Sequence, residues 1–181
     1  MTTEQDRRAL VSCACGQVQF ESMGAPIVSA ACYCASCQEA GRRFEQLPGA
    51  RPVLGLDGST QYVLYRKDRV RCLKGGDLLQ EQRLKPESPT RRLFAACCNS
   101  PMVLDMTKGH WLTIYASRLP DGAPPLEMRV MTKDRRAGVE LADDVPNYAG
   151  HSGRFMRKLI AAWIGMGFRA PVFPYGKPAT D

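Results

Sequence analysis

Residues 13–37 read CACGQVQFESMGAPIVSAACYCASC and hold five of the eight cysteines in the 181-residue chain. Thiolates that lie one or two residues apart can converge on one soft cation, and Zn²⁺ accepts them in a tetrahedral shell. Further along the chain two more cysteines stand side by side. Seven cysteines therefore fall into three tight clusters: Cys13 and Cys15; Cys32, Cys34 and Cys37; Cys97 and Cys98. This pattern predicts a protein that binds zinc, with one or two ions per chain.

The length and composition indicate a folded domain. A chain of 181 residues buries about 70% of the surface it exposes when unfolded, and 44% of the residues are hydrophobic. Residues 1–8 are polar, so we expect neither a secretory signal nor a membrane anchor, and a cytoplasmic location. Disulfides rarely persist in that reducing compartment. Metal binding is therefore preferred to a disulfide framework, which remains the alternative.

The net charge of +7 is compatible with an anionic small-molecule partner. The lysines and arginines are scattered in short groups and form no long basic run. Scattered positive charge is typical of a solvated surface, so we expect no nucleic-acid partner. The sequence does not predict an oligomeric state.

Short runs rich in β-branched and aromatic residues indicate a mainly β fold. A short helix is expected over residues 37–44. Glycine and proline predict loops over residues 74–90 and 119–125. The expected strands are residues 17–21, 27–31, 61–66, 70–73, 93–96, 111–116 and 126–131.

The carboxyl-terminal region changes to a helical period. Ser152 is a candidate cap at the start of the helix, and Gly165 with Gly167 would end it. We expect this amphipathic helix, residues 151–168, to pack on a zinc-binding β domain of residues 10–150, with residues 169–181 as a tail. Its apolar residues recur three to five positions apart: Phe155, Leu159, Ile160, Trp163 and Ile164.

Four segments of the chain resemble one known family, the glutathione-dependent formaldehyde-activating enzyme and centromere protein V family. The family's motifs are an opening CxCGxVxF, a central CxCxxC, a CGSP segment and a closing DDLPxF. The matching residues are Cys13, Cys15, Gly16, Val18 and Phe20; Cys32, Cys34 and Cys37; Cys98, Asn99, Ser100 and Pro101; and 143–148.

The resemblance implies a β-tent fold of short antiparallel strands with two kinds of zinc site. In the family pattern, Cys13 and Cys15 join the late cysteine segment around a structural zinc. The resemblance assigns the catalytic zinc to Cys32, Cys34 and Cys37.

The late segment departs from the family pattern CxxCG, because Ala95 stands at its first cysteine and Asn99 at its glycine. Cys98 then serves as the third ligand of the structural site. Cys97 is one candidate for the fourth, although neighbouring side chains in a strand point to opposite faces. Water or another residue is the alternative, or the site is empty.

The resemblance implies a zinc-dependent carbon–sulfur lyase that acts on an adduct of a thiol, such as glutathione, with a small carbonyl compound. Zinc at a three-cysteine site can stabilise an incoming thiolate or polarise a carbonyl oxygen. His110 and His151 are expected to be ordinary histidines, and no general base is identified. The alternative is a noncatalytic zinc-binding module that recognises a protein or nucleic acid. Redox sensing by Cys97 and Cys98 is a third hypothesis.

Overall fold

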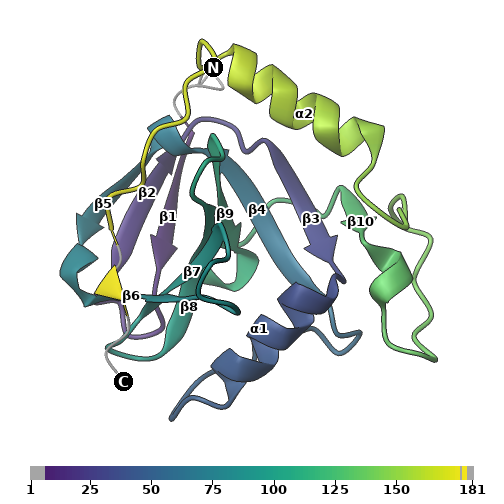
Figure 1. Cartoon of the computed structure of the whole chain (residues 1–181), viewed down its shortest axis with the longest axis horizontal. Coiled ribbons are helices and arrows are strands. Elements are labelled where there is room, and N and C mark those ends of the chain that lie inside the picture. The colour runs from purple at the N-terminus through teal and green to yellow at the C-terminus, as the bar shows by residue number, and fades with distance from the viewer. Residues whose placement is uncertain (1–6, 176, 179–181) are drawn as a thin grey trace.

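The computed structural model describes residues 7–175 and 177–178, and over these residues the chain is mainly β, as predicted (Figure 1). The two α-helices of this part are α1 (Ala35–Glu45) and α2 (Gly153–Ile164). The strands are β1 (Arg8–Ser12), β2 (Gln19–Met23), β3 (Val28–Cys32), β4 (Thr60–Arg66), β5 (Val70–Lys74), β6 (Leu79–Gln82), β7 (Thr90–Ala95), β8 (Ser100–Met106), β9 (Trp111–Tyr115), β10 (Met128–Val130) and β11 (Lys177–Pro178).

The strands form two sheets. One has three strands in the order β1-β2-β5, and the other has eight in the order β10-β3-β4-β9-β8-β7-β6-β11. Neighbouring strands are antiparallel except at the two ends of the larger sheet, where β10 pairs with β3 and β11 with β6 in parallel. The prediction of short antiparallel strands is confirmed for the body of both sheets. The β-tent name stays a prediction.

The larger sheet contributes to two hydrophobic clusters, one from each face. On β4, Val63 packs with residues of both sheets in the first cluster, whereas Leu64 belongs to the second, which includes residues of α1 and α2. Side chains alternate between faces along a strand, so both faces of β4 are buried. This explains why residues 61–66 read as an apolar run. Figure 1 shows α1 and α2 near opposite ends of β3.

Helix α2 begins and ends where the sequence predicts. The Ser152 hydroxyl accepts a hydrogen bond of 3.0 Å from the backbone N–H of Phe155, and Gly165 is the carboxyl-terminal cap. Phe155 and Leu159 are buried, but Ile160 and Ile164 are 48% and 56% exposed. The apolar face that the sequence predicts is therefore only partly covered.

One predicted loop is wrong in part. Residues 74–90 contain β6, which pairs with β7 and places Leu79 in the core. The sequence pattern does not predict β6, because its other residues, Gln80, Glu81 and Gln82, are polar and give no apolar alternation. Strands β1 and β8 were also not predicted. Residues 119–125 contain neither a helix nor a strand of the named elements, as expected.

The division into a domain of residues 10–150, a helix and a tail stays a prediction. Within the expected tail, Phe173 is buried in the first hydrophobic cluster, and its carbonyl oxygen accepts a hydrogen bond from Arg91. Residues 1–6, 176 and 179–181 lie outside the described part. Among the described residues, no helix has the length and apolar character needed to cross a membrane.

Candidate metal centres

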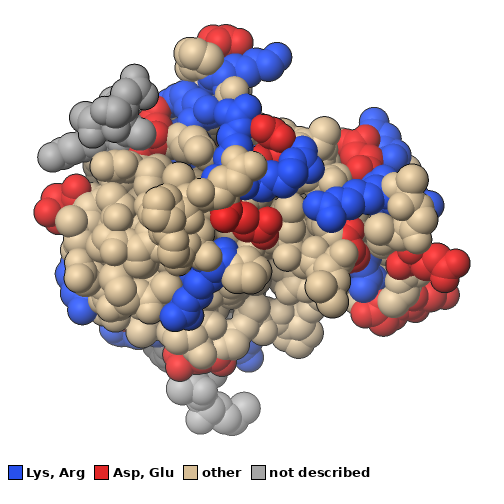
Figure 2. Space-filling view, turned by 90° about the horizontal axis from the view of Figure 1, so that it is seen from below, with Lys and Arg blue, Asp and Glu red and all other residues tan. Residues whose placement is uncertain are grey.

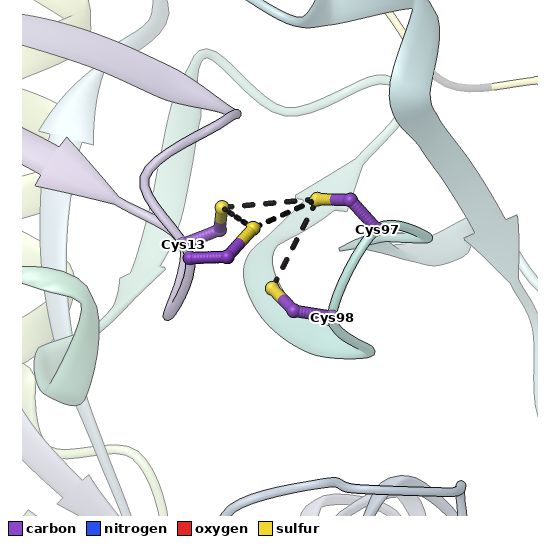
Figure 3. Close-up of side chains that lie close together, drawn as sticks. Cys13, Cys97 and Cys98 are labelled. Atoms are coloured by element: carbon purple, nitrogen blue, oxygen red, sulfur yellow. Dashed lines mark hydrogen bonds between the residues drawn. The ribbon is translucent and has the colours of Figure 1, made fainter.

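The first cysteine cluster joins two turns that are distant in sequence. Cys13 and Cys15 follow β1, and Cys97 and Cys98 follow β7. The Cys15 and Cys97 sulfurs are 3.4 Å apart, and the Cys13 and Cys15 sulfurs are 3.5 Å apart. Cys97 Sγ lies 3.9 Å from both Cys13 Sγ and Cys98 Sγ (Figure 3). All four sulfurs lie within 4.8 Å of one another, so they can hold one metal ion.

Cys97 and Cys98 lie in the turn after β7, where adjacent side chains can face the same metal ion. Residues 96–99 form a turn rather than a strand, so the two adjacent side chains are not forced to opposite faces. Asn99 has a φ of 52°, in the left-handed region that asparagine tolerates better than most residues. Asn99 therefore adopts a conformation of this turn that most other residues with a β-carbon would adopt at a higher cost. Ala95 is fully buried at the end of β7 and offers no ligand atom.

Ser100 ties this four-thiol cluster to its surroundings. Its Oγ accepts hydrogen bonds of 3.1 Å from Ala14 N and from Arg118 Nη1, and lies 3.1 Å from Cys98 Sγ. Because the other two contacts are N–H donors, the hydroxyl proton is free to point at Cys98. Burial opposes ionisation, but the hydrogen bond from Ser100 and others lower the pKa of Cys98 to about 6. Burial raises the pKa of Cys97.

Arg118 is a buried cation near the four thiols that the sequence argument missed. It is 6% exposed, and burial lowers its pKa, while the charges of Cys98 and Cys13 act in the opposite direction. Four thiolates around a divalent ion leave a net charge of about −2, which a nearby guanidinium offsets. No signal in the sequence links Arg118 to the cysteines, because the two approach each other only through the β7 to β9 fold.

The second cluster lies where β3 meets α1. Cys32 ends β3, Cys34 is the amino-terminal cap of α1, and Cys37 belongs to its first turn. The backbone N–H of Cys37 donates a hydrogen bond of 3.4 Å to Cys34 Sγ. The three sulfurs lie within 4.8 Å of one another. The positive end of the helix dipole further favours negative charge at this position.

The three sulfurs compete for negative charge. Hydrogen bonds from Cys32 and Cys37 lower the pKa of Cys34 to about 2. A hydrogen bond with Cys34 raises the pKa of Cys32. At Cys37, a hydrogen bond with Cys32 lowers the pKa, but Cys34 and burial outweigh it and raise the pKa to about 11. A divalent cation removes this competition because it stabilises all three as thiolates.

A large chamber opens beside this three-thiol cluster. It has a volume of about 660 Å³, within the range of pockets that bind small molecules, and all three cysteines lie in its wall. Its remaining wall comes from the larger sheet, from the segment between β6 and β7 and from α2. An open cleft at Cys32, Cys34 and Cys37 is the feature that favours a catalytic over a purely structural site. The four-thiol cluster does not line this chamber.

Two polar residues of the chamber wall were not predicted. Arg92 is 2% exposed, and its Nη2 donates a hydrogen bond of 3.2 Å to the carbonyl oxygen of Ser36, in the first turn of α1. His151 lines the chamber and stacks on Phe155, with ring centroids 5.3 Å apart. Their place is set by tertiary packing, and nothing in the local sequence around either residue marks it.

The remaining candidates behave as ordinary structural residues. His110 stacks on Trp163 at 5.5 Å, its Nε2 lies 2.8 Å from the carbonyl oxygen of Leu159, and burial lowers its pKa. Cys72 belongs to neither cluster. All eight cysteines are free thiols, which rules out the disulfide framework considered as an alternative.

The fold and the two sites define a mainly β protein with two clusters of thiols, each able to hold a metal ion. Residues 8–46 match the model of the family described as glutathione-dependent formaldehyde-activating enzyme. The matched segment contains Cys13, Cys15 and the three-thiol cluster, so it supports the resemblance over the opening and central cysteine motifs.

No curated protein matches the chain. A crystal structure of a Rhodobacter sphaeroides protein covers 78% of this chain and 99% of its own, with 15% sequence identity and a TM-score of 0.44.

Proposed function

We propose that this protein binds zinc at both cysteine clusters and uses the cluster of Cys32, Cys34 and Cys37 to make or break a carbon–sulfur bond. The substrate is an adduct of a thiol, such as glutathione, with a carbonyl compound. The observation that carries the proposal is the position of the three sulfurs in the wall of a ligand-sized chamber. The family match supports the thiol and carbonyl chemistry.

The two clusters suit different tasks. The four-thiol cluster can complete a tetrahedral shell by itself, which is typical of a structural zinc site. Three protein ligands leave a fourth position for an exogenous group. When bound there, zinc supplies a positive charge that stabilises the thiolate of the incoming thiol. Three anionic ligands weaken its action on a carbonyl oxygen, so delivery of the thiolate is the favoured role.

The chain's own residues then act on the substrate as follows. Cys32, Cys34 and Cys37 fix the position of the reacting sulfur. In the bond-forming direction that sulfur adds to the carbonyl carbon, and the π electron pair of the carbonyl moves to oxygen, which takes a proton from water. The reverse direction breaks the carbon–sulfur bond.

Metal stoichiometry tests the proposal. Elemental analysis of the wild type should give two zinc ions per chain, and Cys34→Ser and Cys98→Ser should each lose one. Glutathione binding, measured by calorimetry, should be lost in Cys34→Ser and retained in Cys98→Ser if that variant folds. Cys72→Ser is the matched control, because Cys72 lies in neither cluster. One ion per chain, lost only in Cys98→Ser, would rule out the proposed catalytic centre.

A noncatalytic zinc-binding module is the second candidate, and the exposed face of α2 favours it. Ile160 and Ile164 on α2 and Phe168 just after it are 48%, 56% and 61% exposed, which fits a surface covered by a protein partner. On the face seen in Figure 2, basic side chains lie interspersed with acidic ones, so that face gives no support to a nucleic-acid partner. Two bound zinc ions without glutathione binding or carbon–sulfur chemistry would favour this function.

A further inference from the structure

The chamber is much larger than a one-carbon carbonyl compound requires. Its volume is about 660 Å³, whereas a formaldehyde adduct places a single carbon beside the reacting sulfur. Pockets of 300 to 1,000 Å³ typically enclose most of a ligand with many heavy atoms. Because glutathione is polar and charged, it matches the apolar part of the wall poorly, and a one-carbon group would leave most of that part in contact with water.

The wall away from the cysteines is mostly apolar, although it also includes Lys85, Glu87, Ser88, Thr90, Thr113 and His151. Its largest contributors come from three separate parts of the fold, the larger sheet, the segment before β7 and helix α2. A hydrocarbon chain in this space removes apolar surface from water on both sides of the contact, which is worth about 0.8 kcal/mol per methylene and therefore about fourfold in affinity. The main apolar wall residues are Leu64, Leu84, Leu104, Trp111, Val130 and Phe155.

Arg92 places a cation in this wall close to the cysteines. Its Nη2 contacts the backbone of Ser36, which lies between Cys34 and Cys37 on α1. Its Nε is buried and has no hydrogen-bond partner among the described residues. Because Arg92 also lines the chamber, its guanidinium can donate a hydrogen bond to a ligand oxygen at this end.

We infer that the carbonyl half of the substrate carries a long apolar chain, which fills the chamber while its oxygen accepts a hydrogen bond from Arg92. The inference rests on the proposed function, because it names the substrate class of the same site. The polar glutathione part then extends out of the apolar chamber. In the bond-forming direction, negative charge develops on the carbonyl oxygen, next to the guanidinium.

Stable thioethers test the chain length without any reaction. The probes are S-methyl-, S-butyl- and S-hexylglutathione, with affinities measured by calorimetry on the zinc-loaded protein. Affinity should rise about fourfold per methylene, and by at least 100-fold from the methyl to the hexyl compound. Equal affinities for the three thioethers, or no binding of any of them, would overturn the inference.

Two variants that narrow the chamber locate the effect. Leu104→Trp on β8 and Leu84→Trp on the segment before β7 should each abolish most of the gain from methyl to hexyl, because tryptophan occupies the space of the chain. Leu84 lies on a loop, so its variant tests the inference even if Leu104→Trp fails to fold. Leu73→Trp, at an exposed leucine outside the chamber, is the matched control and should keep the gain. Retention of the gain in a folded Leu84→Trp protein would contradict the assignment.

A matched pair of ligands tests Arg92. S-hexanoylglutathione carries an oxygen on the reacting carbon that S-hexylglutathione lacks, so the wild type should bind it at least fivefold more tightly. In a folded Arg92→Gln protein the two affinities should differ by less than twofold. An unchanged preference would show that Arg92 does not contact the oxygen and overturn that part of the inference.

The experiments distinguish failure of the inferred substrate class from failure of the proposed lyase function. If the protein turns over S-hydroxymethylglutathione but binds methyl and hexyl thioethers equally, the proposed function stands and the apolar substrate class is wrong. If affinity rises steeply with chain length but no thiol adduct is made or broken, the chamber is assigned correctly and the lyase function is wrong.

Discussion

The sulfur atoms of Cys15 and Cys97 lie 3.4 Å apart although 82 residues separate them in the chain. This contact places the turn after β7 against the turn after β1. It also brings Cys97 into the position where a fourth ligand is needed, since Ala95 offers none.

Replacing Cys97 tests its role as that ligand. Cys97→Ser leaves three sulfurs in the four-thiol cluster, so we expect at least a tenfold loss of zinc affinity at this site and a lower melting temperature. Competition with a chromophoric chelator measures the affinity. Cys72→Ser should change neither quantity. Wild-type affinity in Cys97→Ser would mean that water or another residue completes the shell.

Ser100 should tune metal binding without being a ligand. Its hydroxyl contacts Cys98 Sγ and Arg118 Nη1, so Ser100→Ala removes a hydrogen bond to a sulfur and leaves a buried guanidinium short of an acceptor. Loss of such a supporting contact typically costs 10-fold to 100-fold in metal affinity. Ser36→Ala is the reciprocal control, because Ser36 Oγ lies 3.2 Å from Cys34 in the other cluster. Each variant should weaken only its own site in chelator titrations.

Substitutions at Asn99 should measure how much the positive φ at this position of the turn after β7 affects stability. Its φ of 52° costs a residue with a β-carbon about 1 kcal/mol, and alanine more than asparagine. We therefore expect Asn99→Ala to lower the free energy of unfolding by about 1 kcal/mol relative to Asn99→Gly, in urea titrations of the metal-free protein. The two variants both lose the 3.0 Å hydrogen bond from Asn99 to Pro48, so their difference isolates the backbone term. Equal stabilities would contradict this account.

Tyr115 should make stability fall at high pH. Burial raises the pKa of its hydroxyl from 10.0 to about 12, so the folded state holds the proton more tightly than the unfolded state. Its stabilising effect is complete below pH 10 and is lost as pH rises from 10 towards 12. Tyr115→Phe lacks this group, so the stability of the wild type relative to this variant should decline over that range, by up to about 2 kcal/mol. A constant difference between pH 8 and 12, measured by urea unfolding, would contradict the assignment.

The fold was predictable where local pattern and burial agree. The strand over residues 61–66 was predictable because both faces of β4 are buried and its residues are mostly apolar. The cap of α2 was predictable because the hydroxyl of Ser152 accepts a hydrogen bond from a backbone N–H that has no partner within the helix. Strand β6 was missed because its polar residues carry no alternation, and its pairing with β7 decides its structure. The outer face of α2 was expected to be covered, yet Ile160 and Ile164 stay about half exposed.

The sequence by itself determined most of the candidate metal ligands, since thiols one or two residues apart can reach a common ion with little help from the rest of the fold. It also determined the three-thiol site almost completely, because Cys32, Cys34 and Cys37 are neighbours on one strand end and one helix turn. Only the tertiary structure decided that Cys97 joins Cys13 and Cys15, and that Arg92 lies beside an apolar chamber. Those contacts join segments far apart in the chain, and they depend on how the sheets and helices pack rather than on any local pattern.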